Sequence, residues 1–217
     1  MALPKAVRRL TPDRVRHDPR LRALALGSGL IPPRPMHSAG EAEVLARLVH
    51  GARRVVELGV YEGSSALVLC QALGLAAELH LVDPFIDSSG WALPAGWTAT
   101  PAATRMVMRR AGRQGGPSIH WHIVRSQELG RSWAGGPVDC VFIDGDHSPE
   151  GCREDFEVWA PHVAGDGAIA FHDARDGLAD GSGGIGPTAV VNELFRAGPA
   201  PWEIVEEVDS LVVVRRR

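Results

Sequence analysis

Short apolar runs alternate with amphipathic stretches from residue 54 to the end of the chain. The spacing of the amphipathic stretches predicts helices over residues 41–49, 64–73, 102–111, 150–162 and 188–196, with a helical turn from Gln127. The apolar runs are typical of buried strands over residues 54–58, 78–82, 119–124, 138–143 and 168–171. This repeated alternation predicts an α/β fold in which helices cover both faces of a parallel sheet.

Two further apolar runs end the chain, at residues 202–208 and 211–215, with only Asp209 and Ser210 between them. Two residues cannot make the crossover that parallel strands require, so we expect the last strand to run antiparallel. The sequence therefore predicts a Rossmann-like, doubly wound sheet of seven strands, mostly parallel, with an antiparallel last strand.

The first 40 residues differ in composition from the rest of the chain. Residues 1–22 carry seven basic side chains against two acidic ones, and residues 31–35 read Ile-Pro-Pro-Arg-Pro. We expect a basic, proline-rich arm over residues 1–40 with one short helix, largely solvated; a lid over an anionic ligand or a dimer contact is the alternative. A single domain then follows over residues 41–217, with Ser38 placed to cap its first helix.

Composition and charge exclude several classes of protein. The 217 residues are 45% hydrophobic and 23% charged, which suits one globular domain with a sizeable core. A net charge of -3 disfavours a nucleic-acid partner, and no apolar run approaches the ~20 residues of a membrane span. No signal peptide follows Met1, and Cys70, Cys140 and Cys152 form no CxxC pair. We therefore expect a cytoplasmic protein in which Cys70 and Cys140 are buried and reduced.

Charged side chains follow two of the predicted strands. Asp144, Asp146 and His147 come directly after the run 138–143, while His172 and Asp173 come after the run 168–171. The carboxyl ends of parallel strands line the ligand crevice of such a sheet. A charged cluster there is costly to bury unless something pairs with it, and a divalent metal ion is the obvious partner.

A glycine turn joins the first strand of the sheet to its helix, in the segment Glu-Leu-Gly-Val-Tyr-Glu-Gly-Ser-Ser over residues 57–65. Gly59 allows the backbone to approach a ligand closely, while Gly63 and the helix N-terminus offer free N–H groups. Asp83 ends the next strand, where its carboxylate could accept both hydroxyls of a ribose. These residues indicate a nucleoside ligand lying across the first two strands.

A dinucleotide is the competing ligand, because an acid about 20 residues after a glycine also fits a dinucleotide-binding fingerprint. The motif GxGxxG is absent, however, and Glu57 would repel a pyrophosphate while attracting an ammonium group. An NAD(P)-dependent oxidoreductase would also be expected to carry a Tyr-x-x-x-Lys or similar pair. Tyr61, inside the turn, is the only tyrosine, and Lys5, in the arm, is the only lysine.

These motifs resemble those of the class I S-adenosylmethionine-dependent methyltransferases, and more narrowly the metal-dependent O-methyltransferases. The segment 57–65 is similar to the glycine motif of the catechol O-methyltransferases. Residues 142–147 and 171–173 resemble a bacterial branch that acts on sugars and other natural products, with cephalosporin-hydroxylase-like proteins as neighbours. The resemblance covers residues 41–173 and leaves out the arm and the segment 174–187.

The resemblance implies S-adenosyl-L-methionine as cofactor and assigns the residues that bind it. Glu57, Gly59 and Ser65 would hold the methionine part, on a turn shaped by Tyr61 and Gly63. Asp83 would bind the ribose, and Ser126, Gln127 and Asp146 would flank the adenine.

The same resemblance implies a magnesium-type ion held by Asp144, His172 and Asp173, which would bind the acceptor hydroxyl and lower its pKa. The catechol enzymes have a carboxylate at the position of His172. An imidazole there shifts the preference toward Mn²⁺, Fe²⁺, Co²⁺ or Zn²⁺, or places His172 behind the ligands. His147 occupies the position of their lysine base, so it would take the hydroxyl proton; the alternative is that it only stabilises its loop.

The function expected from these residues is methyl transfer to a hydroxyl of a small molecule, a sugar or another natural product. The alternatives are the NAD(P)-dependent oxidoreductase, a non-haem metal oxygenase built on His147, Asp144 and His172, and a binding protein without activity. The acceptor is expected to contact the long segments 84–100, with Trp91 and Trp97, and 174–187. A homo-oligomer, most simply a dimer, is expected because related enzymes often pair.

Overall fold

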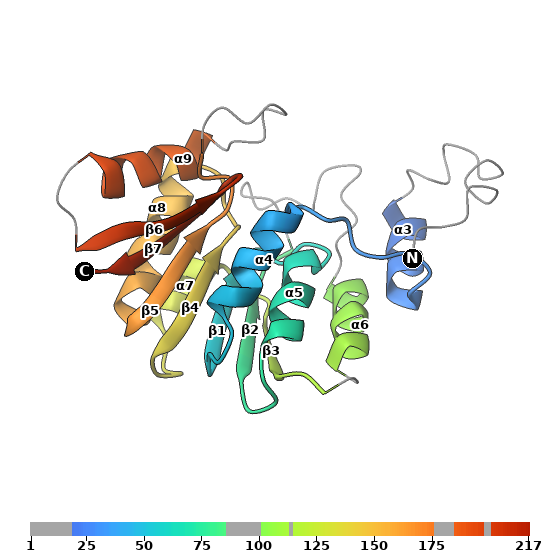
Figure 1. Ribbon diagram of the computed structural model, residues 1–217. Coiled ribbons are helices and arrows are strands. Elements are labelled where there is room, and N and C mark those ends of the chain that lie inside the picture. Colours follow the sequence, from blue (N-terminus) through green and yellow to red (C-terminus); the bar gives the residue numbers. More distant parts are fainter. Residues whose placement is uncertain (1–18, 86–100, 113–114, 176–184, 198–200) are drawn as a thin grey trace.

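The protein is built on a seven-stranded sheet with the strand order β3-β2-β1-β4-β5-β7-β6 (Figure 1). The structure, a computed structural model, describes residues 19–85, 101–112, 115–175, 185–197 and 201–217. Neighbouring strands from β3 to β5 are parallel, whereas β7 runs antiparallel to both β5 and β6. The predicted fold class is therefore confirmed. The strands are β1 (Arg54–Leu58), β2 (Glu78–Val82), β3 (Ser118–His122), β4 (Val138–Ile143), β5 (Val163–Phe171), β6 (Trp202–Val208) and β7 (Leu211–Arg216).

Helices cover both faces of the sheet, as the alternating pattern predicts. On one face α4, α5 and α6 pack with the first apolar cluster, and they lie in front of the sheet in Figure 1. On the other face α7, α8 and α9 pack with the second cluster. The helices are α3 (Pro19–Ser28), α4 (Ala39–Leu48), α5 (Ser64–Ala72), α6 (Pro101–Gly112), α7 (Ser126–Arg131), α8 (Pro149–Trp159) and α9 (Ile185–Val191).

The central strands carry apolar residues on both faces, which is why their sequences read as continuous apolar runs. In β4, Cys140 and Phe142 face the first cluster while Val141 and Ile143 face the second. All four side chains are buried, so a shift of the strand by one residue would exchange the side chains that the two clusters pack, and its register is strongly specified. The acids that follow it are thereby held at the carboxyl edge of the sheet.

Three elements differ from the sequence prediction by three residues or more at one end. Strand β5 begins five residues earlier than expected, at Val163, because its exposed first half contains glycines that interrupt the apolar pattern. The helix expected over residues 150–162 ends at Trp159 and continues as a 3₁₀ turn over Ala160–His162, where Pro161 interrupts it. The helix expected over residues 188–196 begins at Ile185 and continues as a π-helix over Asn192–Arg196.

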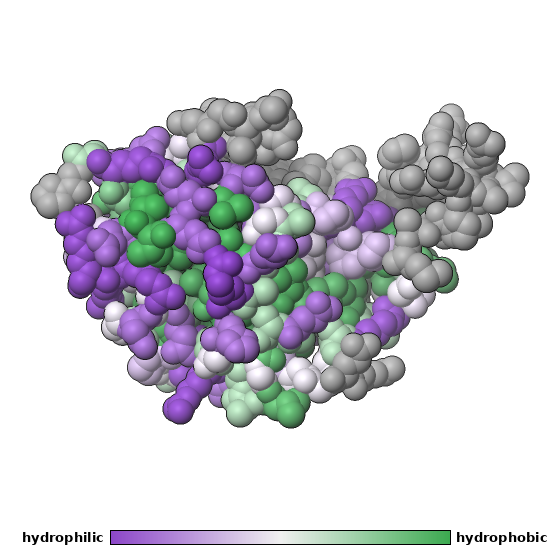
Figure 2. Space-filling view, viewed as in Figure 1, coloured by the Kyte–Doolittle hydropathy of each residue, from purple (hydrophilic) through white to green (hydrophobic). Residues whose placement is uncertain are grey.

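The outer edge of the sheet is protected by charge. Strand β6 places Glu203, Glu206 and Glu207 along this edge, and each is paired with an arginine. Figure 2 shows the hydrophilic residues that gather over these last strands, at the left of the view. Charged side chains on an edge strand discourage pairing with another sheet. The tight connection between β6 and β7, through Asp209 and Ser210, is confirmed as an antiparallel hairpin.

The described part of the arm is folded against the domain. Helix α3 packs on α6, with Leu26 fully buried and Arg110 donating to the carbonyl oxygens of Leu26 and Gly27. This differs from the solvated arm that the composition favoured, because the charge pattern does not reveal the packing of Leu26. Residues 1–18, which hold most of the basic side chains, lie outside the described residues.

Helix α4 begins at Ala39, two residues before the predicted start, and has the predicted cap. Ser38 is its N-cap and forms a capping box with Glu41. All three cysteines are free and buried, as expected for Cys70 and Cys140. In the part of the chain that the structure describes, no helix has the length and apolar character needed to cross a membrane.

Candidate functional site

The glycine turn after β1 lies against the acid that ends β2. The backbone N–H groups of Val60 and Tyr61 donate to Asp83 Oδ2 over 2.8 and 2.9 Å, and Phe85 N donates to Asp83 Oδ1 over 2.6 Å. Asp83 therefore holds the turn in place. A carboxylate accepts about four hydrogen bonds, so these three leave Asp83 about one further site, whereas the predicted contact with both hydroxyls of a ribose would use two.

Gly59 is required for a reason that its sequence context does not show. Its φ is +86°, and a Cβ added there would lie 2.1 Å from the carbonyl oxygen of Asp144. The prediction assigned this glycine to close approach of a ligand, whereas the structure packs it against the backbone that follows β4. The glycine turn is thus in direct contact with the backbone of Asp144.

Glu57 is buried at the end of β1, next to the glycine turn. Its Oε1 accepts a hydrogen bond from Ser65 Oγ, and its Oε2 is buried without a hydrogen-bond partner. Burial raises the pKa of Glu57 well above its ordinary value, and the charges of Asp144 and Asp83 raise it further. The structure thus brings together two of the residues predicted to hold the methionine part, Glu57 and Ser65.

Replacing Glu57 with glutamine should make the protein more stable than the wild type at alkaline pH. The raised pKa means that the folded state keeps a proton that the unfolded state releases, so the wild type loses stability as pH rises. The advantage of Glu57→Gln should therefore grow from pH 5 to pH 9. We expect a shift of about 3 °C or more in the midpoint of thermal unfolding, which corresponds to about 1 kcal/mol in a chain of this size.

Glu43→Gln, on the exposed side of α4, is the matched control and should shift the midpoint little at either pH. A constant difference between Glu57→Gln and the wild type from pH 5 to pH 9 would show that Glu57 does not hold this proton.

One of the three residues predicted at the adenine, Ser126, meets an acid that the sequence did not single out. Ser126 Oγ donates to Oδ1 of Asp155, a buried residue of α8, whose Oδ2 has no hydrogen-bond partner. Burial raises the pKa of Asp155 to about 7, with a contribution from the charge of Asp146. Asp146 itself accepts from Ser148 N over 2.8 Å, and Gln127 is half-buried at the start of α7.

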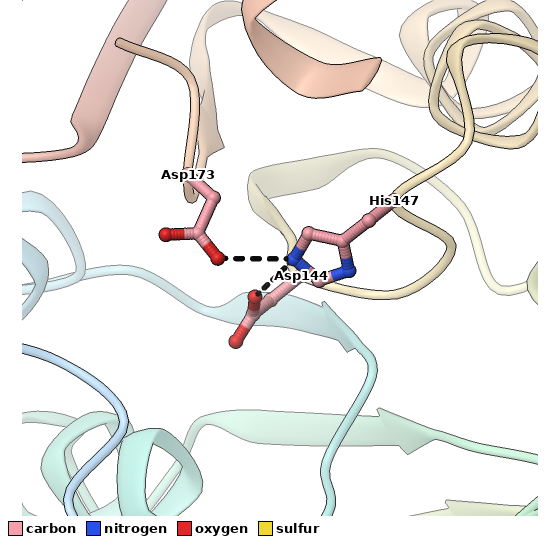
Figure 3. A group of neighbouring side chains, drawn as sticks. All are labelled: Asp144, His147 and Asp173. Carbon is pink, nitrogen blue, oxygen red and sulfur yellow. Dashed lines mark hydrogen bonds and ion pairs between the residues drawn. The ribbon is translucent and has the colours of Figure 1, made fainter. Parts of the chain in front are cut away.

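Asp144, His147 and Asp173 lie together at the carboxyl edge of β4 and β5 (Figure 3). We call these three residues the convergent group. His147 Nε2 lies 3.1 Å from Asp173 Oδ2 and 3.7 Å from Asp144 Oδ1. One ligand atom from each of the three residues lies within 4.8 Å of the others. Two carboxylates and one imidazole are a donor set that fits a divalent cation such as Mn²⁺ or Zn²⁺.

The ring of His147 is held in one orientation. Its Nδ1 lies 3.0 Å from the carbonyl oxygen of Gly145 and its Nε2 lies 3.1 Å from Asp173 Oδ2. Both oxygens can only accept, so this geometry fits a ring that carries a proton on each nitrogen. The hydrogen bond with Asp173 raises the pKa of His147 despite its partial burial. Gly186 packs against this loop so closely that a Cβ there would lie 2.0 Å from the carbonyl oxygen of His147.

His172 lies behind this group and is buried. Its Nδ1 is 3.1 Å from Asp144 Oδ1 and 3.5 Å from Asp173 Oδ2, while its Nε2 is 3.4 Å from Glu41 Oε2. Burial alone would lower the pKa of His172, but the three acids outweigh it and raise the pKa to about 12. The predicted ligand set thus shares Asp144 and Asp173 with the convergent group, which contains His147 in place of His172.

Glu41 is the acid that sequence reasoning missed. It is buried in the first turn of α4, where its Oε1 accepts from the backbone N–H and the hydroxyl of Ser210. Burial would raise the pKa of Glu41, but contacts with His172, Ser210 and Ser38 lower it to about 2. Its capping-box position was the only signal in the sequence. The segments with Trp91, Trp97 and most of residues 174–187 lie outside the described residues.

Comparison with known proteins places this chain in a family. The family described as "Methyltransferase domain" matches residues 56–174, a range that holds the glycine turn and all the acids and histidines of the convergent group. A search of curated proteins found no match to this chain.

Three solved structures share the fold over nearly the whole chain at low identity. The O-methyltransferase TomG from Streptomyces achromogenes, involved in tomaymycin synthesis and solved with SAM, is 17% identical, with a TM-score of 0.60 and coverage of 95% of this chain and 90% of that one. Cofactor-bound Rv0187 from MTB is 20% identical, with a TM-score of 0.61 and coverage of 100% and 99%.

The third is the O-methyltransferase from Bacillus cereus, solved with SAH, which is 17% identical with a TM-score of 0.60 and coverage of 95% and 93%. At these identities the structural similarity establishes the fold, while the family match covers more than half of the chain. The resemblance found in the sequence motifs is confirmed, and the chain belongs to the family of methyltransferase domains.

Proposed function

We propose that the protein transfers the methyl group of S-adenosyl-L-methionine to a hydroxyl of a small molecule, with the help of a divalent metal ion. The observation that carries this proposal is the contact between the glycine turn and the convergent group. Gly59 packs against the backbone carbonyl of Asp144. A methyl donor held on the turn would thereby lie next to an acceptor held at Asp144, His147 and Asp173. Two structural neighbours bound to SAM or SAH, both O-methyltransferases, support the choice of cofactor.

On the methyl-donor side, each residue has a specific part. Glu57 and Ser65 lie where the methionine part would sit, and Glu57 Oε2 lacks a hydrogen-bond partner. The carboxyl of Glu57, protonated in the absence of the cofactor, would release its proton when the ammonium group pairs with it. Asp83 would bind the ribose through the acceptor site that its backbone contacts leave free. Ser126, Gln127 and Asp146 would line the adenine, with Asp155 fixing Ser126 from behind.

Asp144 and Asp173 would hold the metal ion, with an imidazole nitrogen as a further ligand. The sequence assigned that place to His172, whose Nδ1 lies within 3.5 Å of both acids. Mg²⁺ is the first candidate, and the imidazoles also suit Mn²⁺. When bound, the ion would lower the pKa of the acceptor hydroxyl and orient it.

His147 is the proposed base. Its Nε2 faces the place where the acceptor hydroxyl would lie, and Nδ1–H is held by the carbonyl of Gly145. As the acceptor oxygen forms its bond to the methyl carbon, the carbon–sulfur bond breaks and S-adenosylhomocysteine leaves. The hydroxyl proton passes to Nε2. Positioning of oxygen, carbon and sulfur in line supplies much of the acceleration.

The acceptor class that we propose is a sugar or another natural product. The support is the resemblance of residues 142–147 and 171–173 to a bacterial branch with such acceptors, and one neighbour acts in tomaymycin synthesis. A net charge of -3 disfavours a nucleic-acid acceptor. We further propose a homodimer in the cytoplasm.

Titration of S-adenosyl-L-methionine into the purified protein with Mg²⁺ present, followed by calorimetry, should show one-to-one binding in the micromolar range, which corresponds to about -8 kcal/mol. Formation of S-adenosylhomocysteine with a panel of catechols, other phenols and free sugars then identifies the acceptor. Absence of binding to folded protein would contradict the proposal. Binding of NAD(P) in the same assay would instead favour the oxidoreductase.

A further inference from the structure

The segment before α4 forms hydrogen bonds with the glycine turn through side chains that have no part in the proposed chemistry. We call residues 19–38, which comprise α3 and the chain that leads to α4, the N-terminal strap. It contacts three of the four residues in the segment 61–64, from the left-handed Tyr61 to the first residue of α5.

The main contact is a two-pronged ion pair at Glu62. Arg22 Nε donates to Glu62 Oε1 over 2.7 Å, and Arg22 NH2 donates to Oε2 over 2.6 Å. The backbone N–H of Arg34 donates to the same Oε2 over 2.8 Å. The side chain of Glu62 is fully buried and that of Arg22 is 18% exposed, so solvent screens this pair only weakly. A paired arginine fork is among the strongest and most directional contacts available to a carboxylate.

Glu62 occupies a part of the turn that needs support. Its two neighbours, Tyr61 and Gly63, have φ values of +49° and +84°. A left-handed conformation is unfavourable for tyrosine, so the surrounding contacts must hold it in place. Thr104 Oγ1, on α6, donates to the carbonyl oxygen of Tyr61 over 2.8 Å and gives the turn a further support besides Asp83.

Two further contacts of the strap flank Glu62. Arg34 NH1 donates to the hydroxyl of Tyr61 over 3.1 Å. His37 Nδ1 lies 3.2 Å from the carbonyl oxygen of Ser38, which can only accept, so Nε2 is left to accept from Ser64 Oγ over 3.0 Å. The strap thus fixes the turn at its left-handed residue, at its buried acid and at the N-terminus of α5.

We propose that the N-terminal strap sets the affinity for the methyl donor, with Arg22 and Glu62 as positioning residues. This inference rests on the proposed binding of S-adenosyl-L-methionine to the glycine turn. Neither side chain is assigned a contact with the cofactor. They act by holding the turn in the conformation that the cofactor meets, so that the cost of ordering the turn falls on folding and not on binding.

The test compares Arg22→Met and Glu62→Gln with the wild type in calorimetric titrations with S-adenosylhomocysteine. We expect each variant to raise Kd by ~10-fold, within the usual range of coupling between two sites. The double variant should be no weaker than the weaker single variant, because both changes remove the same contact. Arg131→Met, which breaks the exposed pair of Arg131 with Glu154 on the other side of the sheet, is the matched control and should leave Kd unchanged.

Binding of Mn²⁺ separates positioning from a general loss of structure. The variants should bind Mn²⁺ as the wild type does, since the strap does not touch Asp144, His147 or Asp173. If one variant fails to fold, the other carries the test. A change in Kd for S-adenosylhomocysteine of less than twofold in a folded variant would overturn the proposal, as would equal weakening of Mn²⁺ binding.

A second measurement uses the wild-type protein. Coupling is reciprocal, so S-adenosylhomocysteine should slow amide hydrogen exchange in α3 if docking of the strap favours binding. Unchanged exchange in α3, together with measurable binding, would contradict the role of the strap and leave the proposed function intact. Absence of binding to the wild type would instead contradict the proposed function itself.

Discussion

Replacing Asp144 with asparagine should abolish metal binding and reduce methyl transfer by at least roughly a thousand-fold, which corresponds to about 4 kcal/mol of lost transition-state stabilisation. Asp144 is the acid shared by every donor set at this edge, since both His147 and His172 point a ring nitrogen at its Oδ1. The asparagine keeps the shape of the side chain but removes the charge. Titration with Mn²⁺, followed by its paramagnetic resonance signal, measures the loss directly.

Asp139→Asn is the matched control because it lies at the opposite end of the same strand, β4. Its Oδ2 accepts from the backbone N–H groups of Arg53 and Arg54, and the asparagine oxygen can still do so. This variant should bind Mn²⁺ and transfer methyl groups as the wild type does. Wild-type activity in Asp144→Asn, or wild-type activity after complete removal of divalent ions by a chelator, would contradict the metal-dependent mechanism.

The strands and helices at the centre of the sheet could be predicted because local pattern and tertiary burial agree there. Strands β1, β2 and β4 are buried on both faces over most of their length, so most of their positions are apolar and the runs are easily recognised. Strand β5 could be predicted only in its second half, because residues 164–166 are not fully buried and carry no apolar signal. The packing of Leu26 in the arm could not be predicted from the sequence, because it depends on partners in α6 that lie far away along the chain.

The convergent group could be predicted because strand ends gather at one edge of a parallel sheet, whatever their distance in the sequence. Asp144, His147 and Asp173 each follow a recognisable strand. Glu41 and Glu62 were not found, because their partners lie far away in the sequence and no pattern marks a single acid in a helix or a turn. Glu41 meets Ser210 across 169 residues, and Glu62 meets Arg22 across 40.

Which imidazole serves as ligand and which as base is a question of distances of a few ångströms, and sequence spacing does not resolve such distances. His147 and His172 both follow strands and both face Asp144 and Asp173. Burial distinguishes them. His172 is buried against Glu41, whereas the side chain of His147 is 44% exposed and can meet an incoming acceptor. This difference favours His147 as the base and leads to a separate expectation for it.

Replacing His147 with alanine should reduce the turnover rate by a factor on the order of 10²–10⁴ while leaving Mn²⁺ affinity close to that of the wild type. A base acts only when it is neutral, and contact with Asp173 raises the pKa of His147, so the wild-type rate should rise with pH from the acidic side through neutrality. His147→Ala should lose this dependence. The measurement is the rate of S-adenosylhomocysteine formation from pH 6 to pH 9 with the best acceptor of the panel.

His50→Ala, an exposed histidine next to the end of α4, should change neither the rate nor the pH profile. Added imidazole should restore part of the activity of His147→Ala, because the exposed position leaves room for a free base, and should not restore Asp144→Asn. If His147→Ala instead loses Mn²⁺ with its activity, His147 is a metal ligand and the proton must leave by another route. The two roles therefore separate in one titration, because a base contributes to the rate alone whereas a ligand contributes to both the rate and the affinity for the ion.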